Sequence, residues 1–251
     1  MNLWNLARNY YRRTSFKPDR FSILLSPVYI IRRGLFIAIR EFAPMIGGDV
    51  LDLGCGSKPY KSLFTSASTY VGVDMESTGH DHRDSNIDVF YDGHALPFPN
   101  GRFDCVVSFE VFEHIFNLPT IVAEIGRVTR SGGMLLISIP FAWPEHEVPY
   151  DFARYTSFGI RAILREGGYE VLQLRKTTSH IMAAFQILIA YLSPDTCKRR
   201  YVRYLRQVLV VFPITLTACV VDFIFPKRYN YYSNAVILAR KVEADGAMTS
   251  A

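Results

Sequence analysis

Short apolar runs alternate with helical patterns through the middle of the chain. Asp49–Leu53 has the pattern of a buried strand that ends at Gly54, and similar runs recur after it. The stretches that follow Asn117 and Thr156 instead repeat their apolar residues at helical spacing. The seven strands expected are Asp49–Leu53, Tyr70–Val73, Ile87–Phe90, Asp104–Phe109, Met134–Ile139, Tyr169–Leu174 and Asn234–Arg240.

Alternating strands and amphipathic helices are typical of a parallel sheet that is covered on both faces. We therefore expect an α/β fold with a doubly wound, mostly parallel, seven-stranded sheet. Ser131-Gly132-Gly133 is expected to end the helix that Asn117 begins, and Gly167-Gly168 to end the helix that Thr156 begins. Ligands of such sheets bind beyond the carboxyl ends of the strands, so candidate chemistry is expected there.

The two flanks of this core are basic. The 251-residue chain has a net charge of +5, to which residues 1–40 contribute +7 and residues 194–230 contribute +5, so the middle is mildly acidic. Such flanks favour an anionic membrane, an acidic ligand or a nucleic acid, and a solvated basic face has the same composition. The expected organisation is a helical N-terminal extension over 1–45, a core over 46–175, an apolar and basic helical insert over 176–232, a final core strand within 233–243 and a tail over 244–251.

No secretory signal is expected, because the apolar run Phe21–Ile31 lies far from the start of the chain and ends in Arg32-Arg33. Gln207–Val221 is uncharged over 15 residues, but a helical span needs roughly 20, and Pro213 is expected to interrupt the run. A full membrane crossing is therefore not expected. The expected location is the cytoplasm, with peripheral attachment if the insert binds lipid.

Four cysteines are scattered along the chain and form no C-x-x-C pair. Neither a disulfide scaffold nor a structural zinc site is expected from them, and no other metal site is expected. Cys55 and Cys105 are interpreted as small buried hydrophobic residues rather than as nucleophiles. The four are Cys55, Cys105, Cys197 and Cys219.

The first predicted strand ends in Asp52-Leu53-Gly54-Cys55-Gly56-Ser57. Two glycines one residue apart permit a tight turn and let a ligand approach the main chain. The second strand ends in Val73-Asp74, and an acid about twenty residues after such a turn is placed to accept both hydroxyls of a ribose. Pro59 stands where a dinucleotide motif has its third glycine, so a nucleoside without phosphates fits better than a pyrophosphate. A third loop, Asp92–Phe98, offers a carboxylate to an adenine amino group.

Five segments together resemble the class I S-adenosylmethionine-dependent methyltransferases, which have a Rossmann-like fold. They are most similar to the branch with an L-P-F loop and a Glu-His pair after the fourth strand. Glu124–Gly133 is similar to the family's E-I-x-R-V-x-K-P-G-G and departs from it at Arg130 and Ser131. The resemblance covers residues 46–175 and the final strand, through Val50–Tyr60, Tyr70–Met75, Asp92–Phe98, Phe103–His114 and Glu124–Gly133.

The resemblance implies S-adenosyl-L-methionine as the cofactor. It implies that Gly54, Cys55 and Gly56 pass under the methionine part of the cofactor. Asp52 would orient the turn, through the backbone or the methionine ammonium, and Phe109 would line the cleft near the sulfonium.

On the adenosine side, the resemblance implies that Asp74 binds the ribose hydroxyls and that Met75 covers the adenine. Asp92 and Gly93 would read the adenine edge. Lys58 stands where the family often has a further glycine, which leaves the local backbone path open.

The methyl acceptor is expected to meet the loop after the fifth strand, which is similar to E-H-x-x-P-x-D-x-x-R-Y-T in part of the family. His146 in this loop is the candidate catalytic base, because its type of side chain titrates near neutral pH. Asp151 and Arg154 are interpreted as an ion pair that fixes the loop. Glu113-His114 is interpreted as a polar pair that holds a loop, rather than as catalytic.

Strands six and seven form a short hairpin in this family, so the 176–232 segment is an insert. It predicts either a helical lid over the active site that buries its apolar faces against the N-terminal helix or an element of the membrane interface, and both hold if the lid opens at a bilayer. Nucleic acid is not expected as a partner, because no recognised RNA-binding module accompanies the basic flanks.

The predicted function is methyl transfer from S-adenosylmethionine to a small-molecule, sugar-linked or lipid-linked acceptor, most simply through oxygen. The alternatives are a membrane-associated lipid or quinone methyltransferase and a non-catalytic module that binds the cofactor and acts as a partner or regulator.

Overall fold

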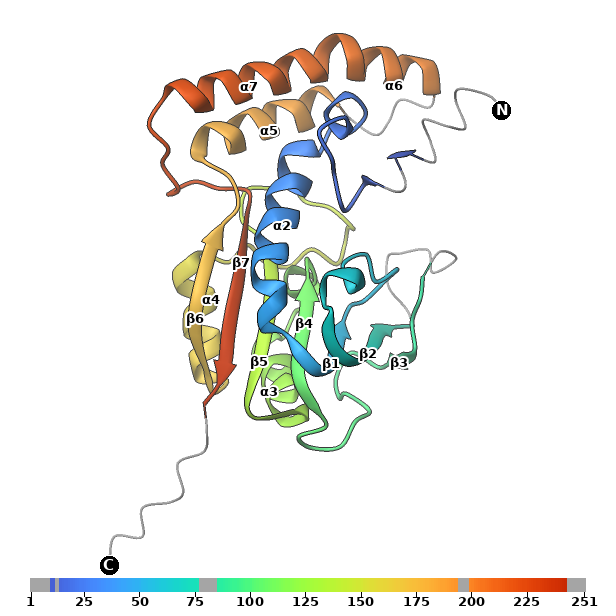
Figure 1. The fold of residues 1–251 in the computed structure, drawn as a ribbon, viewed down its shortest axis with the longest axis vertical. Helices are drawn as coiled ribbons and strands as arrows, with labels where there is room; N and C mark the ends of the chain where they lie inside the picture. Colours follow the sequence, from blue (N-terminus) through green and yellow to red (C-terminus); the bar gives the residue numbers. More distant parts are fainter. Residues whose placement is uncertain (1–9, 12–13, 77–84, 194–198, 243–251) are drawn as a thin grey trace, which may run out of the picture. The chain divides into compact units, whose positions relative to one another are not determined.

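A computed structural model describes residues 10–11, 14–76, 85–193 and 199–242 (Figure 1). The chain divides into two compact units. We call the first the sheet unit, formed by Arg40–Pro140, Glu145–Arg175 and Ala235–Ala251, and the second the helical unit, formed by Met1–Ile39, Phe141–Pro144 and Lys176–Asn234. Cys197 and the expected tail over 244–251 lie outside the described residues, and Cys55, Cys105 and Cys219 are free thiols.

The sheet unit is built on a seven-stranded mixed sheet with the strand order β3-β2-β1-β4-β5-β7-β6. Neighbouring strands from β3 to β5 are parallel, and Figure 1 shows β7 running against β6. The expected α/β fold class is thereby confirmed. The strands are β1 (Gly47–Leu53), β2 (Ser66–Met75), β3 (Val89–Tyr91), β4 (Phe103–Phe109), β5 (Thr129–Pro140), β6 (Tyr169–Lys176) and β7 (Asn234–Lys241).

The strand order reverses direction between β1 and β4, which are hydrogen-bonded neighbours although β2 and β3 lie between them in the sequence. In open α/β sheets the crevice for a ligand opens at such a switch point, outside the carboxyl ends of the strands. The segments after Leu53 and Phe109 therefore flank the place where a ligand is expected.

Helix α3 (Leu118–Val128) follows β4 and buries Ile121, Val122 and Ile125. It ends at Val128, so the expected stop at Ser131-Gly132-Gly133 is wrong. Thr129 already has extended backbone, and its hydroxyl donates to the Ile125 carbonyl at 2.6 Å. The Ser131–Gly133 residues instead lie in a bulge of β5, between its pairings with Phe103 and Cys105.

Helix α4 (Ser157–Glu166) starts and ends where the sequence predicts. The Thr156 hydroxyl accepts from the Gly159 N–H at 3.1 Å, and Gly167 is the C-cap. This confirms the expected bounds of α4. Its residues Ile160 and Leu164 are buried.

The β1–β2 connection differs from a regular doubly wound sheet, because it contains only a 3-10 turn, η3 (Lys61–Leu63). Aromatic side chains occupy this region instead of a helix. Tyr60 packs edge-on to Phe109 with ring centroids 5.1 Å apart, and Phe64 stacks on Tyr70 at 5.8 Å. No helix between these two strands was among the predicted ones.

The helical unit contains most of α2 (Tyr29–Phe42), with α5 (His180–Leu192), α6 (Arg200–Arg206), a π-helical segment η6 (Gln207–Val211) and α7 (Phe212–Ile224). Ile30 of α2 forms a buried cluster with Ile189, Val211 and Ala218. One face of the insert is therefore buried against the N-terminal helix, as one of the two expectations for it required.

Pro213 does not interrupt the apolar run. It follows directly after the π-helical segment η6, at the start of α7, and the helical path continues through both. Among the described residues, Tyr201–Ile224 is one helix that is long and apolar enough to cross a membrane, with 22% of its most apolar window buried. The expected break at Pro213 is thus wrong, and with it the argument from length against a crossing.

Candidate active site

The turn after β1 has the left-handed backbone that glycine tolerates. Gly54 has a φ of +69° and Gly56 a φ of +46°, and the Gly54 N–H donates to the Val73 carbonyl at 2.8 Å. A Cβ built on Gly54 would lie 2.4 Å from Cγ2 of Val111, whereas a Cβ on Gly56 would meet nothing within 4 Å. Gly54 is therefore required by packing, while the space beside the Cα of Gly56, where a Cβ would lie, is open.

Lys58 resolves the backbone path that the sequence left open. Its φ of +53° is the conformation that a glycine would take there. Its side chain is only 3% exposed and forms an ion pair with Asp88, which also accepts from the Gly72 N–H at 2.7 Å. The missing glycine thus leaves the turn in place, because Lys58 is held inward by Asp88.

Asp74 ties the end of β2 to the glycine turn. Its Oδ2 accepts from the Gly56 N–H at 2.9 Å, and its Oδ1 accepts from the Met75 N–H at 2.9 Å. Each carboxylate oxygen has two acceptor positions, so capacity remains for two hydroxyl donors. The arrangement fits the ribose-binding role predicted for Asp74.

Met75 and Gly93 lie against each other, since a Cβ on Gly93 would come within 2.9 Å of Cε of Met75. Asp92 is exposed and closes its own loop by accepting from the N–H groups of His94 at 2.8 Å and Ala95 at 3.1 Å. The hydrogen bonds from Ala95 and His94 hold the pKa of Asp92 below its usual value. The three residues predicted for the adenine side therefore belong to one corner of the sheet unit.

Asp52 is a buried carboxyl group near the end of β1. Its residue is 3% exposed, and its Oδ2 accepts from the Tyr70 hydroxyl at 2.7 Å. Burial raises the pKa of Asp52 to about 7, against the opposing effect of the Tyr70 hydrogen bond. A cationic ligand group beside Asp52 would stabilise its charged form, which fits the methionine ammonium.

Two further predicted residues flank the turn. Burial raises the pKa of the Cys55 thiol to about 12, so the thiol stays protonated and is not a nucleophile. Phe109 is half-buried at the end of β4, where its ring packs on Tyr60 and Phe64.

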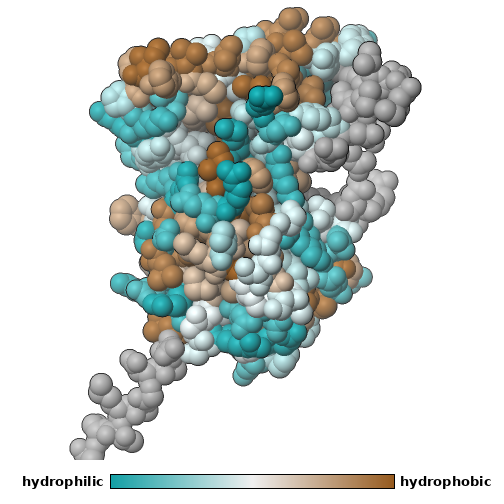
Figure 2. Space-filling model, in the orientation of Figure 1, coloured by the Kyte–Doolittle hydropathy of each residue, from teal (hydrophilic) through white to brown (hydrophobic). Residues whose placement is uncertain are grey.

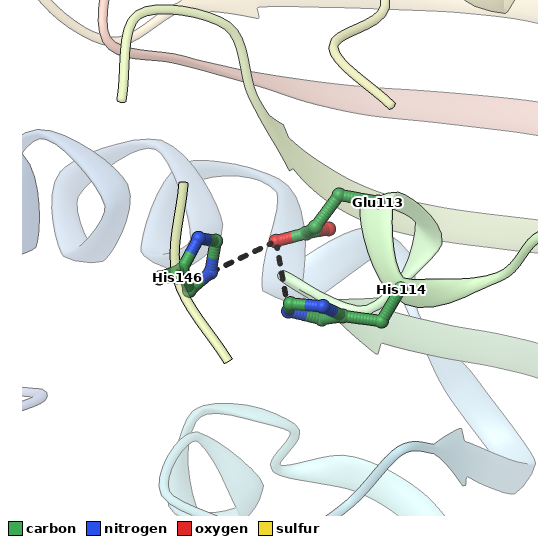
Figure 3. A group of neighbouring side chains, drawn as sticks. All are labelled: Glu113, His114 and His146. Atoms are coloured by element: carbon green, nitrogen blue, oxygen red, sulfur yellow. Dashed lines mark ion pairs between the residues drawn. The ribbon is translucent and has the colours of Figure 1, made fainter. Parts of the chain in front are cut away.

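A carboxylate and two imidazoles meet after the ends of β4 and β5 (Figure 3). Glu113 comes from the 3-10 turn η5 (Phe112–His114), is 1% exposed, and has no hydrogen-bond partner for either carboxylate oxygen. Its Oε1 lies 3.7 Å from Nε2 of His114 and 4.0 Å from Nε2 of His146. Burial, assisted by the charge of Glu110, raises the pKa of Glu113 well above its usual value. We call Glu113, His114 and His146 the Glu-His-His cluster.

The loop that carries His146 is anchored by Asp151. Oδ2 of Asp151 accepts from the His146 N–H at 3.0 Å and lies 3.2 Å from its Nδ1. Arg154 donates to both carboxylate oxygens of Asp151 at 2.5 Å, which confirms the predicted ion pair. Burial alone would raise the pKa of Asp151, but Arg154 and the His146 N–H lower it to about 2. For His146 burial has the opposite effect and lowers the pKa, because the protonated imidazole is the charged form; the charge of Asp151 opposes this shift.

The glycine turn and the Glu-His-His cluster are neighbours through Val111. Its side chain packs over Gly54, and η5 with Glu113 and His114 begins one residue later. The sequence singled out His146 but interpreted Glu113-His114 as a pair that only holds a loop. The signal that could have joined them was their position, since both segments directly follow strands at the switch point of the sheet.

Comparison with known proteins gives the family. Residues 51–137 match the model of a methyltransferase domain. A protein of Mycolicibacterium smegmatis described as a probable S-adenosylmethionine-dependent methyltransferase is 35% identical over 117 residues, which are 45% of this chain and 46% of that protein. Residues 51–137 thus match a methyltransferase domain, and the curated relative is described as S-adenosylmethionine-dependent. The donor that this methyltransferase domain uses is S-adenosylmethionine.

A fatty-acid O-methyltransferase of the same organism is 30% identical over 116 residues, or 43% of this chain and 42% of that protein. The matched region thus spans less than half of these curated relatives. Among solved structures, a methyltransferase of Mesorhizobium loti has a TM-score of 0.51 at 14% identity, covering 82% of this chain and 97% of that one. The [4+2]-cyclase SpnF has a TM-score of 0.54 at 18% identity, with coverages of 91% and 86%. These structural similarities show the fold of the methyltransferase domain and nothing finer.

Proposed function

We propose that this protein transfers a methyl group from S-adenosylmethionine to the hydroxyl or carboxyl oxygen of a lipid or lipid-linked acceptor. The observation that carries the proposal is the contact of Val111 with Gly54, which makes the glycine turn and the Glu-His-His cluster neighbours. A cofactor cradle on one side and proton-accepting groups on the other are what such a transfer requires.

The cofactor supplies a methyl group on a sulfonium, a good leaving group that needs no activation by the protein. Asp74 would accept from the ribose hydroxyls, and Asp52 would pair with the methionine ammonium. Gly56 would leave room for the cofactor beside its Cα, and Met75 would cover the adenine. These roles agree with the burial and hydrogen bonds of the described residues.

The acceptor oxygen must lose a proton if it is a hydroxyl. The step forms an O–CH₃ bond, breaks the S–CH₃ bond and releases S-adenosylhomocysteine, while the hydroxyl proton passes to the Glu-His-His cluster. His146 is the group for this transfer, because burial keeps its imidazole neutral to lower pH and Asp151 fixes its orientation. A carboxylate acceptor would need orientation but no base.

An apolar acceptor is favoured by the insert and by one relative. One relative with a similar domain is described as a fatty-acid O-methyltransferase, a name that implies an apolar substrate methylated on oxygen. In the helical unit, α7 buries Thr215 and Ala218 but exposes apolar side chains on its other face, and Figure 2 shows apolar residues gathered over this helix. The exposed residues of α6, η6 and α7 include Leu205, Leu209, Leu216, Val220, Phe223 and Ile224.

We accordingly propose that the helical unit rests on a cytoplasmic membrane surface, with exposed cations such as Arg203 and Lys227 meeting anionic headgroups. The Leu96-Pro97-Phe98 loop and the Glu113-His114 pair favour the L-P-F branch of the family. A sugar-linked or small-molecule acceptor and a non-catalytic binding module are the competing possibilities.

Labelled-methyl transfer tests the proposal. The full chain is incubated with methyl-labelled S-adenosylmethionine and with lipid, glycan, RNA and small-molecule fractions of a host lysate. We expect the label in the lipid fraction, and its loss with Asp74→Asn, while Arg240→Gln at the far end of β7 serves as a matched control. Label in another fraction would replace the acceptor class, and bound cofactor without transfer to any fraction would favour the non-catalytic module.

A further inference from the structure

Glu113 is a buried polar group for which the described residues supply no hydrogen-bond donor. Neither carboxylate oxygen accepts a hydrogen bond, although the side chain is 1% exposed. A buried carboxylate without partners is destabilising by several kcal/mol unless a proton or a cation accompanies it. The groups that face Glu113 therefore decide whether a proton or a cation accompanies it.

The hydrogen bonds of both imidazoles place their lone pairs toward Glu113. Nδ1 of His114 lies 2.7 Å from the Tyr150 carbonyl, and Nδ1 of His146 lies 3.2 Å from Oδ2 of Asp151. A carbonyl and an ionised carboxylate only accept, so each Nδ1 carries a hydrogen, and in a neutral imidazole the Nε2 then carries the lone pair. Arg154 lies farther from Nδ1 of His146, at 3.4 Å, and both its terminal nitrogens already donate to Asp151.

With both imidazoles neutral and Glu113 ionised, three acceptor atoms face one another. One ligand atom from each of Glu113, His114 and His146 lies within 4.8 Å of the others. Two imidazole nitrogens and one carboxylate oxygen are a donor set for zinc, iron, cobalt and manganese, and a partner on the second ring nitrogen is the usual support of such ligands. Tetrahedral zinc with bonds of ~2.1 Å separates its ligands by about 3.4 Å, so the cluster would contract by less than about 1.5 Å.

We propose that the Glu-His-His cluster is a binding site for one divalent transition-metal ion, held by Glu113 and by Nε2 of His114 and His146. Oε2 of Glu147 lies 3.5 Å from Nε2 of His114 and borders the site. The remaining coordination positions are open to water or to an acceptor oxygen. A catalytic role for this metal ion rests on the proposed methyl transfer and separates two states of the site. Without metal, His146 takes the proton of the acceptor hydroxyl; with metal bound, His146 would be a ligand, the ion would make the hydroxyl more acidic, and the proton would leave to solvent.

Metal binding to the chelator-treated full chain tests this inference without any methyl transfer. Calorimetric titrations with ZnCl₂, CoCl₂, MnCl₂ and MgCl₂ are expected to show one site, strongest for zinc or cobalt and weakest for magnesium. The bound cobalt is expected to give the visible absorption of a site with imidazole ligands. Glu113→Gln and His146→Gln are expected to weaken binding at least ~100-fold, and Asp151→Asn by about 10–100-fold through lost support of His146.

His180→Gln is the matched control, since His180 belongs to the helical unit, and it is expected to bind metal as the unchanged protein does. Circular dichroism checks that each variant is folded. The inference is overturned if no ion binds at 1:1 stoichiometry with a Kd below about 100 µM. It is also overturned if folded Glu113→Gln and His146→Gln bind metal as tightly as the unchanged protein. Metal binding without methyl transfer would leave the site standing and remove the proposed function alone.

Discussion

At the scale of single residues, two buried carboxyl groups dominate the candidate site, those of Asp52 and Glu113. Asp52 has a pKa near 7 because burial disfavours its charged form. Since folding raises that pKa above its usual value of 3.8, the carboxylate weakens the unliganded fold as the pH rises from about 4 to 7. A bound ammonium group would reverse this penalty.

We therefore predict that cofactor affinity rises with pH through about 7 as Asp52 loses its proton. Asp52→Asn should remove that pH dependence and weaken binding about 10–100-fold at pH 8, because a hydrogen bond between charged groups contributes about 1.5–3 kcal/mol. Calorimetry with S-adenosylmethionine at pH 6, 7 and 8 measures both effects.

Asp92→Asn is the control for this measurement, since Asp92 stays ionised over the same range. The ammonium of the cofactor titrates alike in every titration. A rise of affinity with pH that persists unchanged in Asp52→Asn would contradict the role of Asp52.

For His146, we predict that replacement by alanine lowers kcat by about 10²–10⁴-fold and leaves the Kd for the cofactor within a few-fold. Because burial lowers the pKa of His146, the acid limb of the kcat profile should lie below the ordinary histidine value of 6.5. Turnover on the labelled lipid fraction and calorimetry give the two constants. Equal losses in kcat and in cofactor affinity would count against a role on the acceptor side.

At the scale of elements, the strands were predictable and several of their connections were not. Each expected strand lies inside or beside an observed one, because apolar runs bounded by glycine and polar residues specify buried strands. The end of α3 depended on the extended backbone of Thr129, and glycines in a strand bulge resemble glycines at a helix stop. Pro213 looked like a break because proline removes a donor from a helix interior, and the π-helical segment that precedes it has no evident signal in the sequence.

The candidate site divides in the same way. Asp52, Asp74 and the glycines follow strand ends, so their position could be inferred from order along the chain. Glu113 could not, because its significance depends on His146, which lies more than thirty residues away and reaches it only in the folded chain. Left-handed backbone at Lys58 was equally invisible, since it depends on Asp88.

The two glycines of the turn should respond differently to alanine. Gly54→Ala should lower the free energy of unfolding by about 2–4 kcal/mol, from left-handed strain and the contact with Val111. Gly56→Ala should lower it by only about 1 kcal/mol and weaken cofactor binding instead. Urea denaturation and calorimetry measure these effects. Adding Val111→Ala to Gly54→Ala should restore part of the loss, and strictly additive effects would argue against the contact.

At the scale of the whole molecule, the charge and the apolar surface of the helical unit point to lipid. Phe223 is 88% exposed on α7, and Leu209 on η6 is also exposed. Each large apolar side chain that leaves water for a lipid interface gains about 1.5–3 kcal/mol. A membrane would thus cover surface that the described protein leaves in water.

We predict that the full chain co-sediments with vesicles that contain anionic lipid, and that about 0.5 M salt releases much of it, because salt screens exposed charges. Leu209→Glu and Phe223→Glu together should reduce binding more than tenfold. Phe158→Glu, an equally exposed aromatic at the start of α4 in the sheet unit, should leave it unchanged. Absence of binding at low salt would remove the membrane from the proposed function.

The place of Val111 has a kinetic consequence. Its isopropyl group lies against the glycine turn, and the residues that follow it belong to the proposed acceptor side of the site. A methyl donor bound at the glycine turn would therefore also order the acceptor side through Val111. We expect an ordered kinetic mechanism, in which the methyl donor binds before the nucleophile and the demethylated donor is released last.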